Sequence, residues 1–249
     1  MRTVILAGGR GTRLAPYTSI LPKPLLPIGE RAILEILVDQ LRDSGFTDIT
    51  LSVGYLAHLI RAVFENSPSR GVELDYVHEE HPLGTAAPLR LVDRLDDTFL
   101  VMNGDVLTTL DLRELVQFHR ERGHDMTIAS HERRTRFDYG IIQADDEGRV
   151  LAFSEKPEVM SLVSMGIYVM EPQVLDAIPE GISFDVPDLV HALVHDGRSV
   201  GVYRYSGYWR DLGRQEDYAA ANEEWEKAAG ENSGMTEPNL GPDANETTS

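Results

Sequence analysis

The chain has 249 residues, of which 42% are hydrophobic, and a formal net charge of −18. This length is ample for a buried core, and the acidic balance disfavours binding to a nucleic-acid backbone or to an anionic membrane surface. The chain contains no cysteine, which excludes disulfides, thiolate metal sites and thiol catalysis.

Strands and helices alternate through the first half of the chain. Apolar runs predict strands at residues 3–6, 48–54, 72–78 and 98–105. Helical periodicity predicts helices at 32–45, 55–65 and 111–123, and the segment 84–95 is expected to be a loop that enters a helix. This alternation is typical of an α/β fold, a Rossmann-like and mostly parallel sheet flanked by helices on both faces.

The second half is richer in predicted strands. They are expected at residues 126–130, 139–143, 148–155, 162–170 and 200–205, with a hairpin turn at 145–149 and helices at 186–197 and 214–229. We therefore expect a single domain over 1–229, divided into halves at 1–125 and 126–229. Residues 230–249 are polar and contain no Lys or Arg, which predicts a disordered acidic tail.

A glycine-rich loop follows the first predicted strand. Gly8, Gly9 and Gly11 could bring backbone N–H groups close to a phosphate or to the edge of a base, although glycines in such a turn serve packing equally often. Neither GKS/GKT nor G-x-G-x-x-G is present, which disfavours a P-loop and a dinucleotide-binding site.

Charged residues near this loop and at later strand ends suggest phosphate chemistry. Arg13 follows the glycines, and Lys23 is held between two prolines, which restrict the backbone and help to aim the ammonium group. Asp105 and Asp211 each follow a predicted strand. Two carboxylates together with phosphate oxygens form a typical Mg²⁺ site, but the spacing alone leaves open whether these two meet.

The opening segment GGRGTRLAPYTSILPKP resembles the signature of the sugar-1-phosphate nucleotidyltransferases, also called nucleotide-sugar pyrophosphorylases. Further family motifs follow in the family's order, and the resemblance covers about residues 1–225. These motifs are PLGTA (82–86), NGD (103–105), FDYG (137–140), SEKP (154–157), SMGIYV (164–169) and YWRDLGRQEDY (208–218). The resemblance implies a GT-A-like fold whose first half binds the nucleotide and whose smaller, β-rich second half binds the sugar.

The resemblance also implies a reaction and a set of site residues. An NTP and a sugar-1-phosphate would give an NDP-sugar and pyrophosphate, with Mg²⁺ as cofactor. The implied catalytic residues are Arg13, Lys23 and Asp105, and the implied metal ligands are Asp105 and Asp211. The implied nucleotide-binding residues are Leu6, Ala7, Gly8, Gly9, Gly11, Thr12, Gly84 and Thr85, and the implied sugar-phosphate-binding residues are Gly140, Glu155, Lys156 and Ser164.

The substrates are less sharply indicated. The PLGTAAPL and EGRVLAFSEKP segments resemble those of mannose-1-phosphate and heptose-1-phosphate guanylyltransferases, which favours GTP. Ser164-Met165-Gly166 stands where many relatives have Asn-Ala-Gly, which leaves adenylyl or thymidylyl transfer to glucose-1-phosphate open. A non-catalytic relative that binds a nucleotide sugar is a further alternative.

Relatives are commonly dimers or tetramers, which leaves a homo-oligomer open, and the sequence itself does not indicate the oligomeric state. No signal peptide and no run of 18 apolar residues is present, so we expect a cytoplasmic protein without membrane or nucleic-acid partners.

Overall fold

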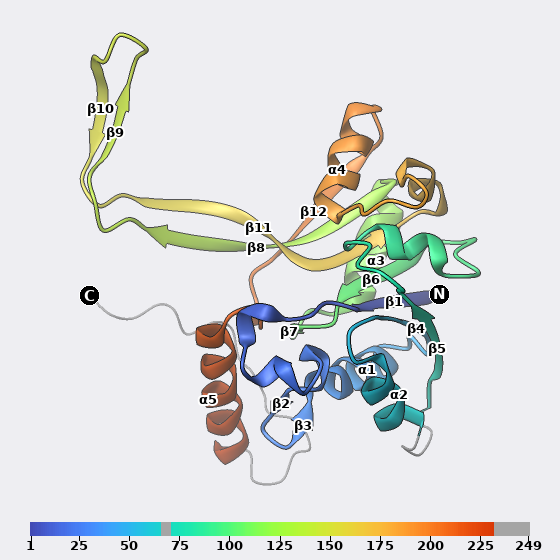
Figure 1. Ribbon diagram of the computed structural model, residues 1–249. Helices are drawn as coiled ribbons and strands as arrows, with labels where there is room; N and C mark the ends of the chain where they lie inside the picture. The colour runs from blue at the N-terminus through green and yellow to red at the C-terminus, as the bar shows by residue number, and fades with distance from the viewer. Residues whose placement is uncertain (66–70, 232–249) are drawn as a thin grey trace.

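The computed structural model describes residues 1–65 and 71–231, so most of the predicted acidic tail lies outside the described residues (Figure 1). Its centre is a seven-stranded sheet in the order β12-β8-β11-β6-β1-β4-β5. Four of the strand pairings are parallel, and β11 pairs antiparallel with both of its neighbours. The strands are β1 (Arg2–Ala7), β4 (Asp48–Val53), β5 (Glu73–His78), β6 (Phe99–Asn103), β8 (Met126–Arg136), β11 (Glu158–Met170) and β12 (Val200–Tyr205). The predicted α/β sheet is thus confirmed.

Within residues 1–65 and 71–231, five α-helices and three pairs of short strands accompany the main sheet. The helices are α1 (Ile33–Asp43), α2 (Ala57–Glu65), α3 (Leu112–Arg122), α4 (Val186–His195) and α5 (Gln215–Glu231). The short strands form three pairs: β2 (Pro27–Ile28) with β3 (Arg31–Ala32), β7 (Val106–Thr108) with β13 (Trp209–Asp211), and β9 (Ile141–Ala144) with β10 (Val150–Ser154). Among the described residues, no helix is both long and apolar enough to cross a bilayer.

A hydrophobic core lies on each face of the sheet, and successive side chains of a strand point into opposite cores. Ile5 of β1 packs into one core with α1, α2 and α3, whereas its neighbour Val4 packs into a second core. The second core includes α4 and a 3₁₀ segment, Ala87–Leu91. The continuous apolar run that predicted β1 therefore reflects burial on both sides.

The segment 84–95 differs from the expected helix. It forms only the short 3₁₀ turn Ala87–Leu91, and its chain turns away at Val92 in an extended conformation. Pro88 stands in the first turn, and the backbone amides of Ala86 and Ala87 both donate to the carbonyl of Phe184. The acceptor of these two amides is therefore at least 97 residues away in the sequence. Apolar periodicity within the segment alone could not reveal such a hydrogen bond.

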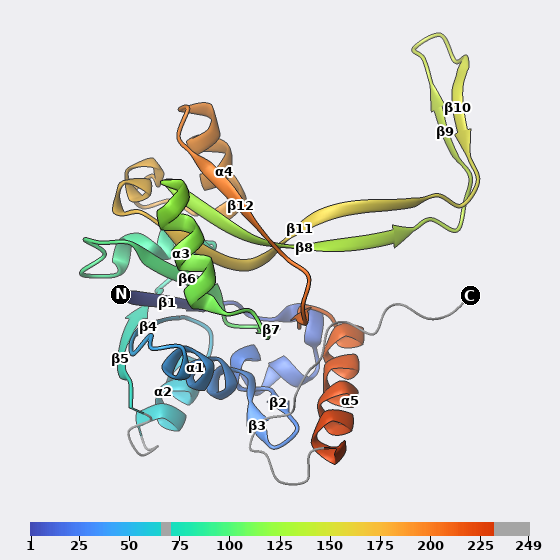
Figure 2. The same cartoon turned by 180° about the vertical axis from the view of Figure 1, so that it is seen from behind.

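The strands β8 and β11 extend far beyond the rest of the sheet. Both continue past their predicted ends, pairing with each other from Met126 and Met170 out to Arg136 and Glu158. The β9–β10 hairpin continues them at the tip, and both views show this structure projecting away from the body of the molecule (Figures 1 and 2). We call residues 131–163 the arm.

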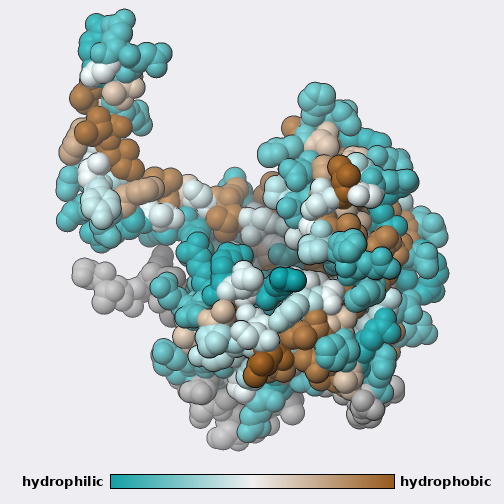
Figure 3. Space-filling view, viewed as in Figure 1, coloured by the Kyte–Doolittle hydropathy of each residue, from teal (hydrophilic) through white to brown (hydrophobic). Residues whose placement is uncertain are grey.

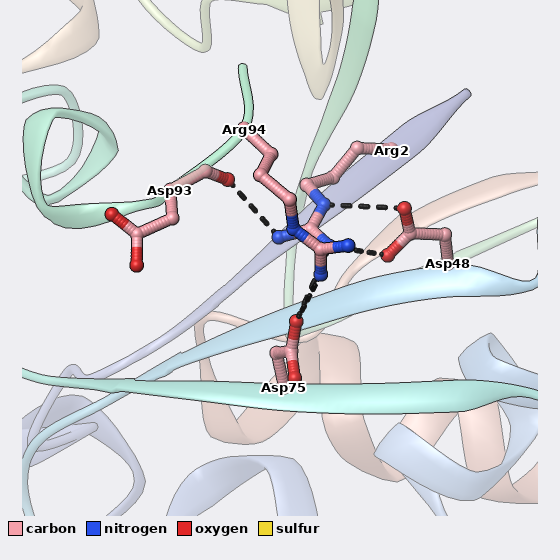
Figure 4. Close-up of polar contacts among 5 residues, drawn as sticks. All are labelled: Arg2, Asp48, Asp75, Asp93 and Arg94. Atoms are coloured by element: carbon pink, nitrogen blue, oxygen red, sulfur yellow. Dashed lines mark hydrogen bonds and ion pairs between the residues drawn. The ribbon is translucent and has the colours of Figure 1, made fainter.

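A charged network fastens the amino ends of β1, β4 and β5. Arg2 is 6% exposed, and its guanidinium lies between the carboxylates of Asp48 and Asp75 (Figure 4). It donates to Asp48 at 2.8 and 3.3 Å, to Asp75 at 3.2 Å and to the carbonyl of Asp93 at 3.0 Å. Arg94 adds a contact of 2.8 Å to Asp75 from the exposed rim. One buried cation therefore joins three neighbouring strands and a loop.

Replacing Arg2 by alanine is expected to lower the free energy of unfolding by about 2 kcal/mol, because the Asp48 and Asp75 charges lose their shared partner. The estimate is below that for a fully buried pair, because these two side chains are 36% and 56% exposed. The melting temperature should fall by about 4–8 °C. Arg94→Ala is the control, with little expected effect; equal losses in both variants would contradict the central role of Arg2.

Candidate functional site

The parallel strands β1, β4, β5 and β6 end at one edge of the sheet, which we call the carboxyl edge. The loops that leave it are in contact: the amide of Gly104 donates to the carbonyl of Leu6 at 2.9 Å, and the amide of Tyr55 donates to the carbonyl of Gly8 at 3.2 Å. In open α/β sheets, ligands bind at this edge. Leu6 and Ala7 are the last two residues of β1, so they lead directly into it.

The glycine-rich loop packs against Lys23. Gly11 has a φ of +60°, a left-handed conformation that glycine adopts without strain. A Cβ at this position would lie 2.9 Å from the Thr18 side chain and 3.1 Å from Cβ of Lys23, so glycine is required here by space as well. Arg13 and Thr12 follow in an exposed 3₁₀ turn, and Gly9 has open space around it. Among the described residues, Arg13 has no ion-pair partner.

Lys23 and Asp105 form an ion pair at the carboxyl edge. Lys23 begins a 3₁₀ turn, stands between Pro22 and Pro24, and is 9% exposed. Its Nζ contacts Oδ2 of Asp105, which lies between β6 and β7. The lysine and the aspartate are 82 residues apart in the sequence. The structure thus brings together two of the residues that the sequence predicts to be catalytic.

Asp211 joins this pair through the β7–β13 ladder. Asp211 is paired with Val106, the residue after Asp105, and the amide of Leu212 donates to the Asp105 carbonyl at 2.9 Å. Asp211 as a whole is exposed, but partial burial of its carboxylate raises its pKa, the negative charge of Asp105 raises the pKa further, and Lys23 opposes both. Two like charges therefore face one another beside a single lysine. The sequence spacing alone leaves open whether Asp105 and Asp211 lie together, and in the structure they do.

Ser164 lies where β11 approaches the NGD segment. Its hydroxyl is 3.1 Å from the Tyr168 hydroxyl and accepts from the Gly166 amide at 3.3 Å. Gly166 has a φ of +74°, and a Cβ there would lie 2.5 Å from the amide nitrogen of the Asn103 side chain. The glycine of the SMG segment thus lets β11 approach the NGD segment closely. Burial raises the pKa of the Tyr168 hydroxyl, and the Asp105 charge contributes to this shift.

Gly84 and Thr85 are fixed against the start of α4. The Thr85 hydroxyl donates to Asp185 at 3.0 Å and accepts from the Val186 amide at 2.8 Å, and the Thr85 amide also donates to Asp185. Gly84 has a φ of +85° and passes against the Phe184 carbonyl. The hydrogen bonds of the Thr85 side chain therefore serve to hold this loop in place.

Three predicted sugar-phosphate residues lie in the arm, apart from the carboxyl edge. Gly140 and Glu155 are close neighbours, since a Cβ on Gly140 would lie 3.1 Å from the Glu155 carboxylate. Lys156 follows at the corner between β10 and β11, is exposed, and has a positive φ of 43°. The structure groups these three with each other, and does not bring them to Lys23, Asp105 or Ser164.

Glu79 was not among the residues predicted from the sequence. It directly follows β5, and the Glu79 carboxylate accepts from the Ser52 hydroxyl at 2.9 Å and from the Leu83 amide at 3.3 Å. A Cβ on Gly8 would lie 2.3 Å from its Oε1, so this carboxylate lies against the glycine-rich loop. Burial raises the pKa of Glu79. Its place at the end of a predicted strand was the available signal.

Comparison with known proteins identifies the family of this chain. The family model described as "Nucleotidyl transferase" matches residues 2–228. A UTP–glucose-1-phosphate uridylyltransferase of Synechocystis is 36% identical over 238 residues, covering 88% of this chain and 61% of the relative. A mannose-1-phosphate guanylyltransferase of Mycobacterium tuberculosis is 37% identical over 222 residues, covering 86% and 62%. This chain thus spans about three fifths of the length of both relatives.

The solved structures include a similar protein with a bound nucleotide analogue. HddC from Yersinia pseudotuberculosis, complexed with GMP-PN, matches with a TM-score of 0.67 and 26% identity, covering 89% of this chain and 98% of that one. The family model spans the glycine-rich loop, the Lys23–Asp105 pair and Asp211 alike. On this evidence the chain belongs to the nucleotidyl transferase family.

Proposed function

We propose that this chain transfers a guanylyl group from GTP to a sugar-1-phosphate of the mannose or heptose type. The observation that carries the proposal is the convergence of Lys23, Asp105 and Asp211 beside the glycine-rich loop at the carboxyl edge. A phosphate oxygen of the sugar phosphate attacks the α-phosphorus of GTP and forms a new P–O bond. The bond between the α-phosphorus and the bridging oxygen breaks, and pyrophosphate leaves with that electron pair.

The charged residues have distinct parts in this reaction. Lys23, held by its prolines and by Asp105, stabilises negative charge on the α-phosphate as the bond order changes. Arg13 lies on an exposed turn next to the loop, where its planar guanidinium suits the departing pyrophosphate. No covalent intermediate with the protein is needed, since positioning and electrostatics carry this type of transfer.

The donor set at Asp105 and Asp211 fits Mg²⁺. Burial raises the pKa of Asp211, and the negative charge of Asp105 raises it further; a divalent cation would offset this second contribution. Among the described residues no third His, Asp or Glu joins them, and Mg²⁺ commonly takes one or two carboxylates with phosphate oxygens and water. When bound, the ion would offset the charge of the triphosphate.

The carboxylate of Glu79 favours guanine among the bases. Guanine presents two adjacent donors, N1–H and the 2-amino group, and an ionised carboxylate accepts two such hydrogen bonds side by side. Uracil and thymine offer one N–H between two carbonyl oxygens, which would repel the carboxylate. Glu79 contacts Gly8 and the amide just before Gly84, two segments that the family resemblance places around the nucleotide.

Glu79→Gln is expected to lower kcat/KM for GTP by about 10- to 100-fold, because an amide replaces one acceptor by a donor opposite the guanine N–H groups. The value for UTP should change little, so the preference for GTP shrinks. Steady-state pyrophosphate release with each nucleotide measures this. The neighbouring exposed Glu80→Gln is the matched control, and equal losses for GTP and UTP would contradict a role in base selection.

A substrate panel tests the proposed function as a whole. GTP, UTP, dTTP, ATP and CTP are each combined with mannose-, heptose- and glucose-1-phosphate in the presence of Mg²⁺, and pyrophosphate is measured. We expect GTP with mannose- or heptose-1-phosphate to be fastest. A preference for UTP and glucose-1-phosphate would instead support the activity that the Synechocystis relative's name describes.

Absence of pyrophosphate with every pair, but tight binding of a nucleotide sugar, would indicate a non-catalytic relative. The chain carries all the charged groups that the reaction requires, which favours the enzyme. These groups are Arg13, Lys23, Asp105, Lys156 and Asp211.

A further inference from the structure

The arm removes part of the proposed sugar site from the rest of it. From Ser130 and Ser164, β8 and β11 pair without interruption to Arg136 and Glu158. Six residue steps of extended strand span about 20 Å, and Lys156 lies beyond that end at the corner with β10. One sugar phosphate, a single ring with one phosphate, cannot contact Ser164 and Lys156 of the same chain in this arrangement.

The tip of the arm gathers charged and polar groups. Lys156 adopts a left-handed backbone conformation, which a side-chain-bearing residue rarely keeps unless its surroundings demand it. Its ammonium group has no ion-pair partner within residues 1–65 and 71–231. Gly140 and Glu155 lie close together at the same tip. These three residues therefore lie together at the arm tip, away from the carboxyl edge of the same chain.

The arm also exposes an unusual amount of apolar surface. Brown, apolar residues gather along the arm in the space-filling view (Figure 3). Large apolar side chains that are 39% to 80% exposed occur throughout it: Phe137, Tyr139, Ile142, Val150, Leu151, Phe153, Val159, Met160 and Leu162. Contiguous apolar surface of this kind marks a face that another protein surface covers.

We infer that the arm of each chain completes the site of a second copy of this chain. The two copies exchange arms, so that each arm tip lies at the carboxyl edge of the other copy. The partner that covers the arm is a second copy of this chain, because that copy supplies the part that each half of the site needs. The carboxyl edge of one copy has no Lys156 of its own within reach, and the arm tip of the other copy carries Lys156. Such an exchange is the self-complementary contact of a two-fold dimer. This inference rests on the proposed function for the role of Lys156.

The ladder argues against the arm folding back on its own chain. β8 and β11 are both central strands of the seven-stranded sheet, and their pairing continues from the sheet into the arm. Turning the tip back to the carboxyl edge of the same chain would break part of that pairing. A partner's arm reaches the edge with every strand pairing of both chains intact.

Mixing two inactive variants tests the exchange. Asp105→Asn disables the edge and Lys156→Glu disables the tip, and the two are co-expressed with different tags and also mixed as purified proteins. If the tip serves the partner's edge, each mixed dimer has one site with both changes and one site with neither. A random mixture should then recover about one quarter of the wild-type rate. No recovery in a mixed dimer isolated by both tags would overturn the exchange.

A matched control uses two changes in the same half of the site. Asp105→Asn with Asp211→Asn must recover nothing, because each site of a mixed dimer then keeps one defect at its edge. If this pair recovered as much as the edge-and-tip pair, recovery would not report an exchanged arm. Activity of the wild-type chain without recovery in the edge-and-tip pair would overturn the exchange and leave the proposed function standing.

A readout independent of activity is the position of the arm itself. A photoreactive benzoylphenylalanine at Tyr139, which is 80% exposed, is placed in ¹⁵N-labelled chains that are mixed with unlabelled ones. We expect a dimer in sedimentation, and crosslinks from position 139 of one label to peptides of the carboxyl edge of the other. A monomer, or crosslinks only within one label, would overturn the exchange even if the wild-type chain showed no nucleotidyl transfer.

Discussion

Asp105→Asn is expected to lower kcat by about 10³-fold, because it removes a full negative charge from the centre that would gather the metal ion and the triphosphate. Asp105 lies at the corner between β6 and β7, contacts Nζ of Lys23 and acts electrostatically on Asp211. The amide has nearly the same volume, so packing is kept. Pyrophosphate release at saturating GTP and sugar phosphate is the measurement.

The fold of the Asp105→Asn variant should survive. Lys23 loses its ion-pair partner, which is unfavourable, while Asp211 loses a like charge nearby, which is favourable, so the melting temperature should move little. Asp111→Asn is the matched control: Asp111 caps α3, accepting from the Arg113 amide, and asparagine caps a helix about as well. A rate for Asp105→Asn within about tenfold of the wild type would argue against its proposed role as a metal ligand.

Asp211→Asn is expected to abolish most turnover, by about 10²- to 10³-fold, and at the same time to raise the melting temperature at neutral pH. Burial, and then the charge of Asp105, raise the pKa of Asp211. An acid whose pKa is higher in the folded state than in the unfolded state weakens the fold when it ionises. The stability present below the unfolded pKa is lost as the pH rises through the folded pKa.

Because the pKa of Asp211 is raised on folding, the predicted stability difference depends on pH. The variant should melt slightly above the wild type near pH 7.5, since solvent screens the charges of an exposed residue, and the gap should close as the pH falls toward the ordinary aspartate pKa of about 3.9. Added Mg²⁺ should raise the melting temperature of the wild type more than that of the variant. Glu223→Gln, an exposed change on α5, is the control. A variant less stable than the wild type at neutral pH would contradict the idea of repelling carboxylates.

The sequence predicts the sheet well because the burial pattern is local. Apolar runs and helical periodicity identify β1, β4, β5, β6, α1, α2 and α3 within one or two residues at most ends. The 84–95 segment fails because its amides bond to Phe184, a distant partner that no local pattern contains.

The candidate site is predictable in its residues but not in its assembly. Lys23 and Asp105 stand out by their flanking prolines and strand end, yet their contact depends on how the loops fold over the edge. Glu79 is not predicted as a site residue, because a single acidic residue after a strand is common. Only its contact with Gly8 distinguishes it. The arm is not predicted, because β8 continues beyond residue 130 and β11 begins before residue 162. Strand-forming residues in the sequence do not reveal whether the rest of the domain packs against the strand.

One irregularity in β11 constrains how the arm can vary in length. Between Ser164 and Tyr168 the strand advances four residues while its partner β8 advances two, from Ser130 to Ile128. The surplus is an even number, so the alternation of sides is the same in the arm as in the sheet. Losing or gaining a single residue between 164 and 168 would exchange the two faces of the β11 side of the arm while the β8 side stayed as it is, so tolerated length changes there should come in steps of two.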